Sequence, residues 1–184
     1  MAEKKKFFSV ELPLIGEKAE VLAFSEEDLA GRTLKIDLTR KLRGKSTEII
    51  FKLKQENKKI RAFPIRLYVL GYFIRRMMRK SIDYVEDSFI AECKDSLLII
   101  KPFLITRKKV SRAVRKALRN KAKEEINNAI KEKISEEIFS ELLSGRFQKS
   151  LSLKLKKIYP LALCEIRDFL IEKEKPGIKV EKIQ

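Results

Sequence analysis

Side chains that could carry out catalysis are few and far apart in this sequence. There is no histidine among the 184 residues, and the two cysteines, Cys93 and Cys164, lie outside any ligand or nucleophile motif. This composition excludes the common zinc sites and the histidine-dependent nucleophiles. The six glycines are scattered, so no glycine-rich phosphate loop is present. We therefore expect no cofactor and no enzyme activity.

Three carboxylates are the remaining candidates for a reaction centre. Asp83, Glu86 and Asp87 lie close enough in sequence to hold a magnesium ion for a nuclease. Acids that flank a strand are more often its solvated edge, and we favour that interpretation. A metal-dependent nuclease remains an alternative that measured RNA cleavage would test.

The strongest pattern is a basic segment at residues 107–123, which contains nine Lys or Arg residues and no acid. On a helix, one side would carry Lys108, Arg112, Arg115, Lys116, Arg119 and Lys123, and the opposite side Val110, Val114, Ala117 and Leu118. A solvated helix face normally mixes charges to form i,i+4 pairs, and this face does not. The segment predicts a helix that packs on a core and lies along RNA phosphates.

Basic residues also gather in three other segments: the N-terminus, residues 75–80, and the acid-free run 146–159. Each is weak by itself, because a basic helix end can simply compensate the helix dipole. Together with the segment 107–123 they predict RNA contacts at several sites. The predicted contact residues are Lys4, Lys5, Lys6, Arg75, Arg76, Arg79, Lys80, Lys108, Arg112, Arg115, Lys116, Arg119, Lys123, Lys154 and Lys157.

The overall charge also predicts a polyanionic partner. Lys and Arg number 43 against 26 Asp and Glu, which gives a net charge of +17. Nucleic acid and an acidic membrane surface are the obvious candidates. The longest apolar runs are interrupted by Arg66 and Lys101 and fall short of the roughly 20 residues that span a bilayer. Glu11 and Pro13 argue against a secretory signal, and isolated cysteines suit a reducing cytoplasm.

Alternating apolar residues predict two antiparallel strand pairs. The first joins residues 34–38 to 49–53 through a turn at 42–47. The second joins residues 83–90 to 96–106 through a polar turn, and Pro102 within it indicates an edge strand or a bulge. Between the pairs, Pro64 suits a first helical turn and predicts a helix at residues 65–80.

The second half of the sequence is mainly helical in composition. Apolar residues recur every four positions through residues 110–138, which would wind around one straight helix, so we expect a break at Asn127-Asn128 and a restart at Ser135. Gly145 predicts a helix end. Residues 149–159 fit either a strand or a helix, and residues 161–171 fit a last strand.

These elements predict one α+β domain at residues 16–175, with a basic arm at 1–15 and a charged tail at 176–184. Its predicted core is Leu34, Ile36, Leu38, Ile49, Phe51, Leu53, Leu67, Leu70, Leu98, Ile100, Val114, Leu118, Ile158 and Ile166. A charged tail of this kind need not fold.

The order of the elements resembles the S3Ae family of small-subunit ribosomal proteins of archaea and eukaryotes. The carriers of the resemblance are Gly31-Arg32 with residues 34–38, the basic residues 75–80, Ile82-Asp83, residues 107–125, residues 156–161 (KKIYPL) and Glu165-Ile166-Arg167. The last two are the most specific. Family members commonly begin with a basic extension and a Trp-Tyr pair, whereas this chain has no Trp and reads Lys6-Phe7-Phe8. The short C-terminus is similar to that of the archaeal branch.

The resemblance implies a single α+β domain with a β-barrel-like antiparallel core flanked by basic helices, and it favours a helix at residues 149–159. It also implies a structural role on the platform of the small ribosomal subunit in the cytoplasm. The implied partners are small-subunit rRNA and neighbouring ribosomal proteins, with mRNA near its exit as a further partner and no membrane. The alternatives are a non-ribosomal RNA-binding protein and a polybasic membrane-surface protein, whose basic face would adjoin bulky exposed apolar groups.

Overall fold

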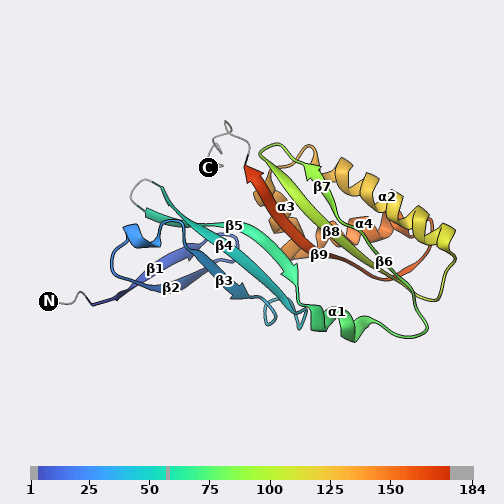
Figure 1. Ribbon diagram of the computed structural model, residues 1–184, viewed down its shortest axis with the longest axis horizontal. Helices are drawn as coiled ribbons and strands as arrows, with labels where there is room; N and C mark the ends of the chain where they lie inside the picture. Colours follow the sequence, from blue (N-terminus) through green and yellow to red (C-terminus); the bar gives the residue numbers. More distant parts are fainter. Residues whose placement is uncertain (1–3, 57–58, 175–184) are drawn as a thin grey trace. The chain divides into compact units, whose positions relative to one another are not determined.

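The chain folds into β-strands and α-helices, which confirms the predicted α+β class (Figure 1). This computed structural model describes residues 4–56 and 59–174, and the tail expected at residues 176–184 lies outside them. The fold divides into two compact units between Leu67 and Tyr68. Among the described strands the sheet is mixed and does not close into a barrel, because β1 and β5 run parallel and edge strands remain.

The first unit consists of strands joined mainly by hairpins. They are β1 (Lys6–Leu12), β2 (Glu17–Ala23), β3 (Thr33–Asp37), β4 (Thr47–Glu56) and β5 (Lys59–Val69), with a 3-10 turn, η1 (Glu27–Leu29), between β2 and β3. β1 pairs antiparallel with β2, and β4 pairs with both β3 and β5. Their buried side chains include Val10, Leu12, Leu29, Ile49, Phe51 and Leu53.

The N-terminal segment, for which a basic arm was expected at residues 1–15, contains the strand β1 from Lys6 to Leu12. Val10 and Leu12 are buried while Phe7, Ser9 and Glu11 face outward, which is the period-two pattern of a strand. β1 pairs with β2 along its whole length. The prediction gave weight to the three lysines and missed the alternation that follows them.

The predicted hairpin between residues 34–38 and 49–53 is confirmed. Leu34 lies opposite Phe51, and Ile36 lies opposite Ile49, in the antiparallel pair of β3 and β4. Leu38 is buried, and its N–H donates to the carbonyl oxygen of Thr47 at 2.9 Å. The hydrophobic period therefore specified the register of this pair.

The helix expected at residues 65–80 is wrong at both ends. β5 continues to Val69, and the helix α1 occupies only Gly71–Met77. Pro64, Leu67 and Val69 are buried in the strand, where pairing with segments distant in sequence outweighs the local helical pattern. The short helix is anchored by Phe73 and Ile74, which pack in a cluster with Val69, Phe103 and Ile105.

The second unit is centred on one long strand. β8 (Ser96–Thr106) pairs antiparallel with β6 (Tyr84–Glu86), β7 (Phe89–Glu92) and β9 (Leu161–Glu174). The predicted second strand pair and the last strand are thus confirmed. The pairing of β8 with β9 shifts register between Lys101 and Pro102, so the bulge predicted from this proline is present and the edge alternative is not.

Three helices follow β8, namely α2 (Arg112–Ile130), α3 (Ser135–Ser144) and α4 (Arg146–Leu155). The break between α2 and α3 is confirmed, but it lies at residues 131–134, after the predicted Asn127-Asn128. Gly145 ends α3 with φ 72°, as predicted. Residues 149–155 are helical, in agreement with the implication of the resemblance.

The helix α3 begins at Ser135, as predicted, but its cap comes from another segment. Asp95, in the turn between β7 and β8, accepts hydrogen bonds from the Ser135 N–H, at 3.1 Å, and from the Ser135 hydroxyl. A carboxylate at a helix N-terminus is favoured by the helix dipole. The packing of α3 on this sheet is completed by Phe139, whose ring meets that of Phe169 edge-on at 4.9 Å between centroids.

Most of the predicted core is confirmed. Buried members are Leu38, Ile49, Phe51, Leu53, Leu67, Leu98, Ile100, Leu118 and Ile166, and half-buried members are Leu34, Ile36, Leu70 and Val114. Ile158 is 39% exposed, so its assignment to the core is wrong. It lies in the turn after α4, whose last residue, Leu155, is buried.

Candidate nucleic-acid interface

The helix α2 is the element that carries the main basic segment. The side chain of Ser111 caps it by accepting a hydrogen bond from the Val114 N–H at 3.4 Å. Leu118, Ala122, Ile126 and Ile130 are buried, and the helix contacts β6, β7 and α4. One side of α2 is therefore held against the second unit, and the rest is presented to solvent.

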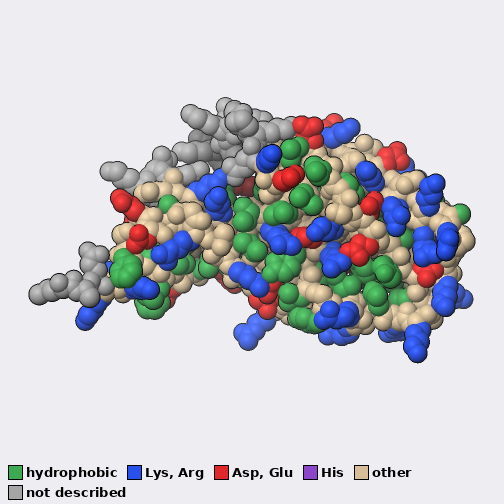
Figure 2. All heavy atoms as spheres, viewed as in Figure 1, with side chains coloured by type: hydrophobic (Ala, Val, Ile, Leu, Met, Phe, Trp, Pro, Cys, Tyr) green, Lys and Arg blue, Asp and Glu red, His purple; other side chains and the backbone are tan. Residues whose placement is uncertain are grey.

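Five of the six cations predicted to share the outer side are exposed. They are Lys108, just before the helix, and Arg112, Lys116, Arg119 and Lys123. Figure 2 shows Lys and Arg side chains gathered along the right-hand margin of the view, over the region in which Figure 1 draws α2. Lys123 also lies over the ring of Phe89, with its Nζ 5.6 Å from the ring centroid.

The exception is Arg115, which is half-buried, whereas Ala117 is exposed. The prediction had placed Arg115 on the outer, basic side of the helix and Ala117 on the apolar side. Arg115 precedes Leu118 by three residues and Ala122 by seven, so it flanks the buried stripe. The four-residue recurrence of apolar positions made the boundary of the buried face uncertain from sequence alone.

The first turn of α2 contains no acid and begins with Arg112. Cations are unfavourable near the positive N-terminal end of a helix dipole, where Asp and Glu would stabilise the helix. Stability alone would therefore select against this arrangement. The exposed Arg112 therefore does not stabilise the helix through its dipole.

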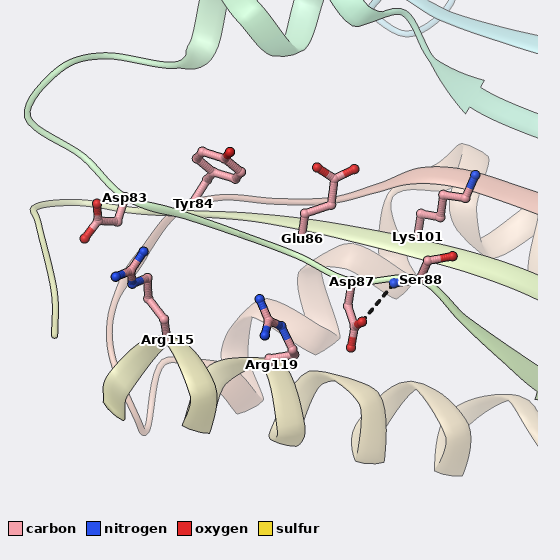
Figure 3. Close-up of a pocket in the computed structure, with 8 residues that line it drawn as sticks. All are labelled: Asp83, Tyr84, Glu86, Asp87, Ser88, Lys101, Arg115 and Arg119. Atoms are coloured by element: carbon pink, nitrogen blue, oxygen red, sulfur yellow. Dashed lines mark hydrogen bonds between the residues drawn. The ribbon is translucent and has the colours of Figure 1, made fainter. Parts of the chain in front are cut away.

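An open pocket of about 750 Å³ lies between α2 and β6 (Figure 3). Arg115 and Arg119 extend from α2 toward β6, which carries Glu86 and is flanked by Asp83 and Asp87. The buried Nε of Arg115 has no hydrogen-bond partner in the described structure. Because the pocket mixes charges of both signs, it does not by itself select an anion or a cation.

The three carboxylates considered for a nuclease have separate contacts. Asp83 accepts a hydrogen bond from the Val110 N–H at 2.9 Å, which positions the segment leading into α2. Glu86 forms an ion pair with Arg167, and Asp87 accepts a hydrogen bond from the N–H of Ser88. Within the described residues, no group of three or more such side chains is placed to hold a metal ion.

The predicted contact residue Lys154 is partly committed within the fold. Its Nζ lies 2.7 Å from Glu125, so it links α4 to α2, and Lys121 meets the same carboxylate at 3.1 Å. Hydrogen bonds from Lys154 and Lys121 hold the pKa of Glu125 below its usual range. Lys157 is exposed beyond the end of α4.

The cluster at residues 75–80 is exposed but is not on one helix. Arg75 and Arg76 lie in the last turn of α1, while Arg79 and Lys80 lie in the segment after it. The expectation that Arg75 and Arg79 share a helix face is therefore wrong, because α1 ends at Met77. Arg76 stacks over Phe73, with 5.4 Å from its guanidinium carbon to the ring centroid.

Lys4, Lys5 and Lys6 are exposed and belong to the first unit, whereas the other predicted residues belong to the second. Lys5 lies over Phe24, with its Nζ 5.3 Å from the ring centroid. The first unit also presents a basic loop between β3 and β4, with Arg40 and Arg43 exposed, which the prediction treated only as a turn. The detectable signal was four cations at residues 40–45 with no acid among them.

None of the described helices combines the length and apolar character needed to cross a membrane. The model of the ribosomal S3Ae family matches residues 1–175. The small ribosomal subunit protein eS1 of Nanoarchaeum equitans (strain Kin4-M) is 26% identical over 190 residues, which cover 97% of this chain and 95% of that protein. These matches confirm the resemblance found in the sequence: the chain belongs to the ribosomal S3Ae family.

Proposed function

We propose that this chain is a structural constituent of the small ribosomal subunit, where it binds rRNA phosphates and neighbouring ribosomal proteins. Its family is one of structural ribosomal proteins, so the chain is not an enzyme. The observation that carries the RNA-binding part of the proposal is the exposed, acid-free set on and before α2: Lys108, Arg112, Lys116 and Arg119.

The geometry of α2 suits an RNA backbone. Its 19 residues span about 28 Å, and the buried side keeps the helix rigid against the second unit. Each phosphate that a cation neutralises releases counterions, which adds affinity that falls with salt. Contacts of this kind position a protein on RNA without reading its sequence.

Contacts with neighbouring proteins form the second part of the proposal. Leu153 is 62% exposed on α4, and Ile158 is exposed after that helix, within the acid-free run 146–159. Apolar side chains among cations suit a partner that shields both from water. The sequence resemblance supports a seat on the platform, near the mRNA exit and the 3′ end of the rRNA, in the cytoplasm.

Sucrose-gradient fractionation of a native extract tests this function. In low salt with adequate magnesium, we expect the chain to sediment with small subunits, and high salt should release it as phosphate contacts weaken. A chain found mainly at the top of the low-salt gradient would contradict the ribosomal role. Preferential co-sedimentation with anionic vesicles over rRNA would instead favour the membrane-surface alternative.

A further inference from the structure

The loop that joins β3 to β4, residues 38–46, is a further basic segment. Figure 1 shows the course of its backbone. It contains Arg40, Lys41, Arg43 and Lys45, and no acid. It belongs to the first unit, whereas α2 belongs to the second. A ligand of this loop would therefore be bound by residues separate from those on α2.

Hydrogen bonds hold the loop in a defined conformation. The N–H of Leu42 donates to the carbonyl oxygen of Leu38 at 2.9 Å, and the N–H of Gly44 donates to that of Thr39 at 2.8 Å. At the start of the loop, Asp37 accepts a hydrogen bond from the Thr39 N–H at 2.7 Å. A loop ordered before binding loses less conformational entropy when a ligand arrives.

Lys41 braces the loop, although its side chain is 40% exposed. Its Nζ donates to the carbonyl oxygen of Ile15 at 2.9 Å and forms an ion pair with Glu17 at 2.8 Å. Both partners lie at the turn between β1 and β2. Because Lys41 is used in this way, the loop is tied to the neighbouring hairpin while Arg40 and Arg43 are exposed.

Arg43 adopts a backbone conformation that favours glycine, with φ 52°. A side chain in the left-handed region strains the backbone, and such strain tends to be kept where the side chain has a function. The next residue, Gly44, has φ 84°, so the chain turns through two consecutive left-handed positions. A glycine at position 43 would serve the turn better, yet the sequence has an arginine.

We propose that the loop at residues 38–46 is a second RNA phosphate-binding site, in which Arg40 and Arg43 contact phosphates and Lys41 is a positioning residue. The guanidinium group presents several donors in a fixed plane and can bind two phosphate oxygens at once. This inference rests on the proposed ribosomal function, because it assumes an RNA that both units contact. It goes beyond that function because it assigns RNA contacts to residues of the first unit, whereas α2 belongs to the second unit.

The test is filter binding of the full chain to protein-free small-subunit rRNA across a series of salt concentrations. For Arg40→Ala with Arg43→Ala, we expect affinity near 0.1 M salt to fall by at least about tenfold and the slope of log affinity against log salt to fall by about 1.5. The matched control is Lys18→Ala, in the same unit, whose exposed side chain pairs with Glu11 at 3.5 Å. It should leave the slope nearly unchanged.

Two single variants separate charge from backbone strain. Arg43→Lys keeps the charge and should keep the slope, with some loss of affinity if two oxygens are bound. Arg43→Gly removes the charge and relieves the strain, so the slope should fall while the melting temperature holds or rises. An Arg43→Gly protein with the wild-type slope would overturn the proposal.

The failure of this proposal can be distinguished from that of the proposed function by testing Arg112→Ala with Lys116→Ala in parallel. If the α2 variant weakens rRNA binding and the loop variant does not, the loop proposal is wrong and the ribosomal function stands. If neither variant weakens binding, both proposals fail. If the loop variant binds free rRNA normally but fails to enter small subunits, the loop contacts a protein, which also overturns the RNA assignment.

Discussion

The two halves of α2 carry the same number of charged residues but arrange them in opposite ways. Residues 112–120 have four cations and no acid, and residues 121–130 have two cations and two acids. In the second half Lys121 pairs with Glu124 and Glu125, and Glu125 also reaches Lys154 on α4. Mixed charges thus tie one half of the helix to the fold, while unmixed charges leave the other half available to a polyanion.

The largest expected effect is a loss of folding stability when a buried residue in the second half of α2 is truncated. Ile126 is completely buried, so Ile126→Ala should lower the free energy of unfolding by about 3 kcal/mol. Urea unfolding followed by circular dichroism measures the change, with exposed Asn128→Ala as the control on the same helix. A change of less than about 1 kcal/mol would contradict the assignment of this half to the fold.

Charge reversal in the first half should affect RNA binding strongly and folding little. Arg112→Glu with Lys116→Glu removes two phosphate contacts and adds repulsion, so affinity for rRNA should fall by about 100-fold near 0.1 M salt. Filter binding measures this fall. Lys121→Ala is the control, because Lys121 is already paired within the helix. Equal losses of rRNA affinity in the control and in the charge-reversal variant would contradict the distinction between the two halves of α2.

The single change Arg112→Glu should raise stability while it weakens binding. An acid in the first turn interacts favourably with the helix dipole, which is worth about 0.5 kcal/mol. Thermal unfolding should therefore shift upward, and the affinity for rRNA should drop in the same protein. If the variant lost both thermal stability and affinity for rRNA, Arg112 would be a residue that stabilises the fold and not one that binds an external ligand.

The smallest expected effect concerns Glu125 and its pH dependence. Hydrogen bonds from Lys154 and Lys121 lower the folded-state pKa of Glu125. The ionised carboxylate therefore stabilises the fold at pH values above its ordinary pKa of 4.5. That contribution is lost as pH falls through the lowered pKa. Glu125→Gln should therefore melt slightly below the wild type at neutral pH, with the difference vanishing in acid.

Binding supplies a second measurement on the same variant. Glu125→Gln releases Lys121 and Lys154 from their shared carboxylate, so affinity for rRNA should rise slightly. A fall in affinity would show that the pairing of Lys154 with Glu125 helps to present the RNA-binding surface.

Local patterns were sufficient for several parts of the fold and for most of the basic face. The alternation of Leu34, Ile36 and Leu38 predicted the pairing of β3 with β4, and Pro102 predicted the bulge in β8. The unmixed charge of residues 107–123 marked α2, with five of its six cations correctly placed outside. These features depend on neighbours within a few residues, so the sequence contains the information directly.

Non-local contacts decided the rest. Residues 65–69 have a helical pattern but form the end of β5, because strand pairing brings in partners from far along the chain. Lys154 resembled a free cation until folding placed it beside Glu125, 29 residues away. The loop at residues 38–46 shows the same limit, because only the folded chain reveals that Lys41 braces it against Ile15 while Arg40 and Arg43 remain exposed. The sequence by itself determined where the charge lies, and tertiary structure decided which charges face outward, because ion pairs and burial depend on residues that meet only after folding.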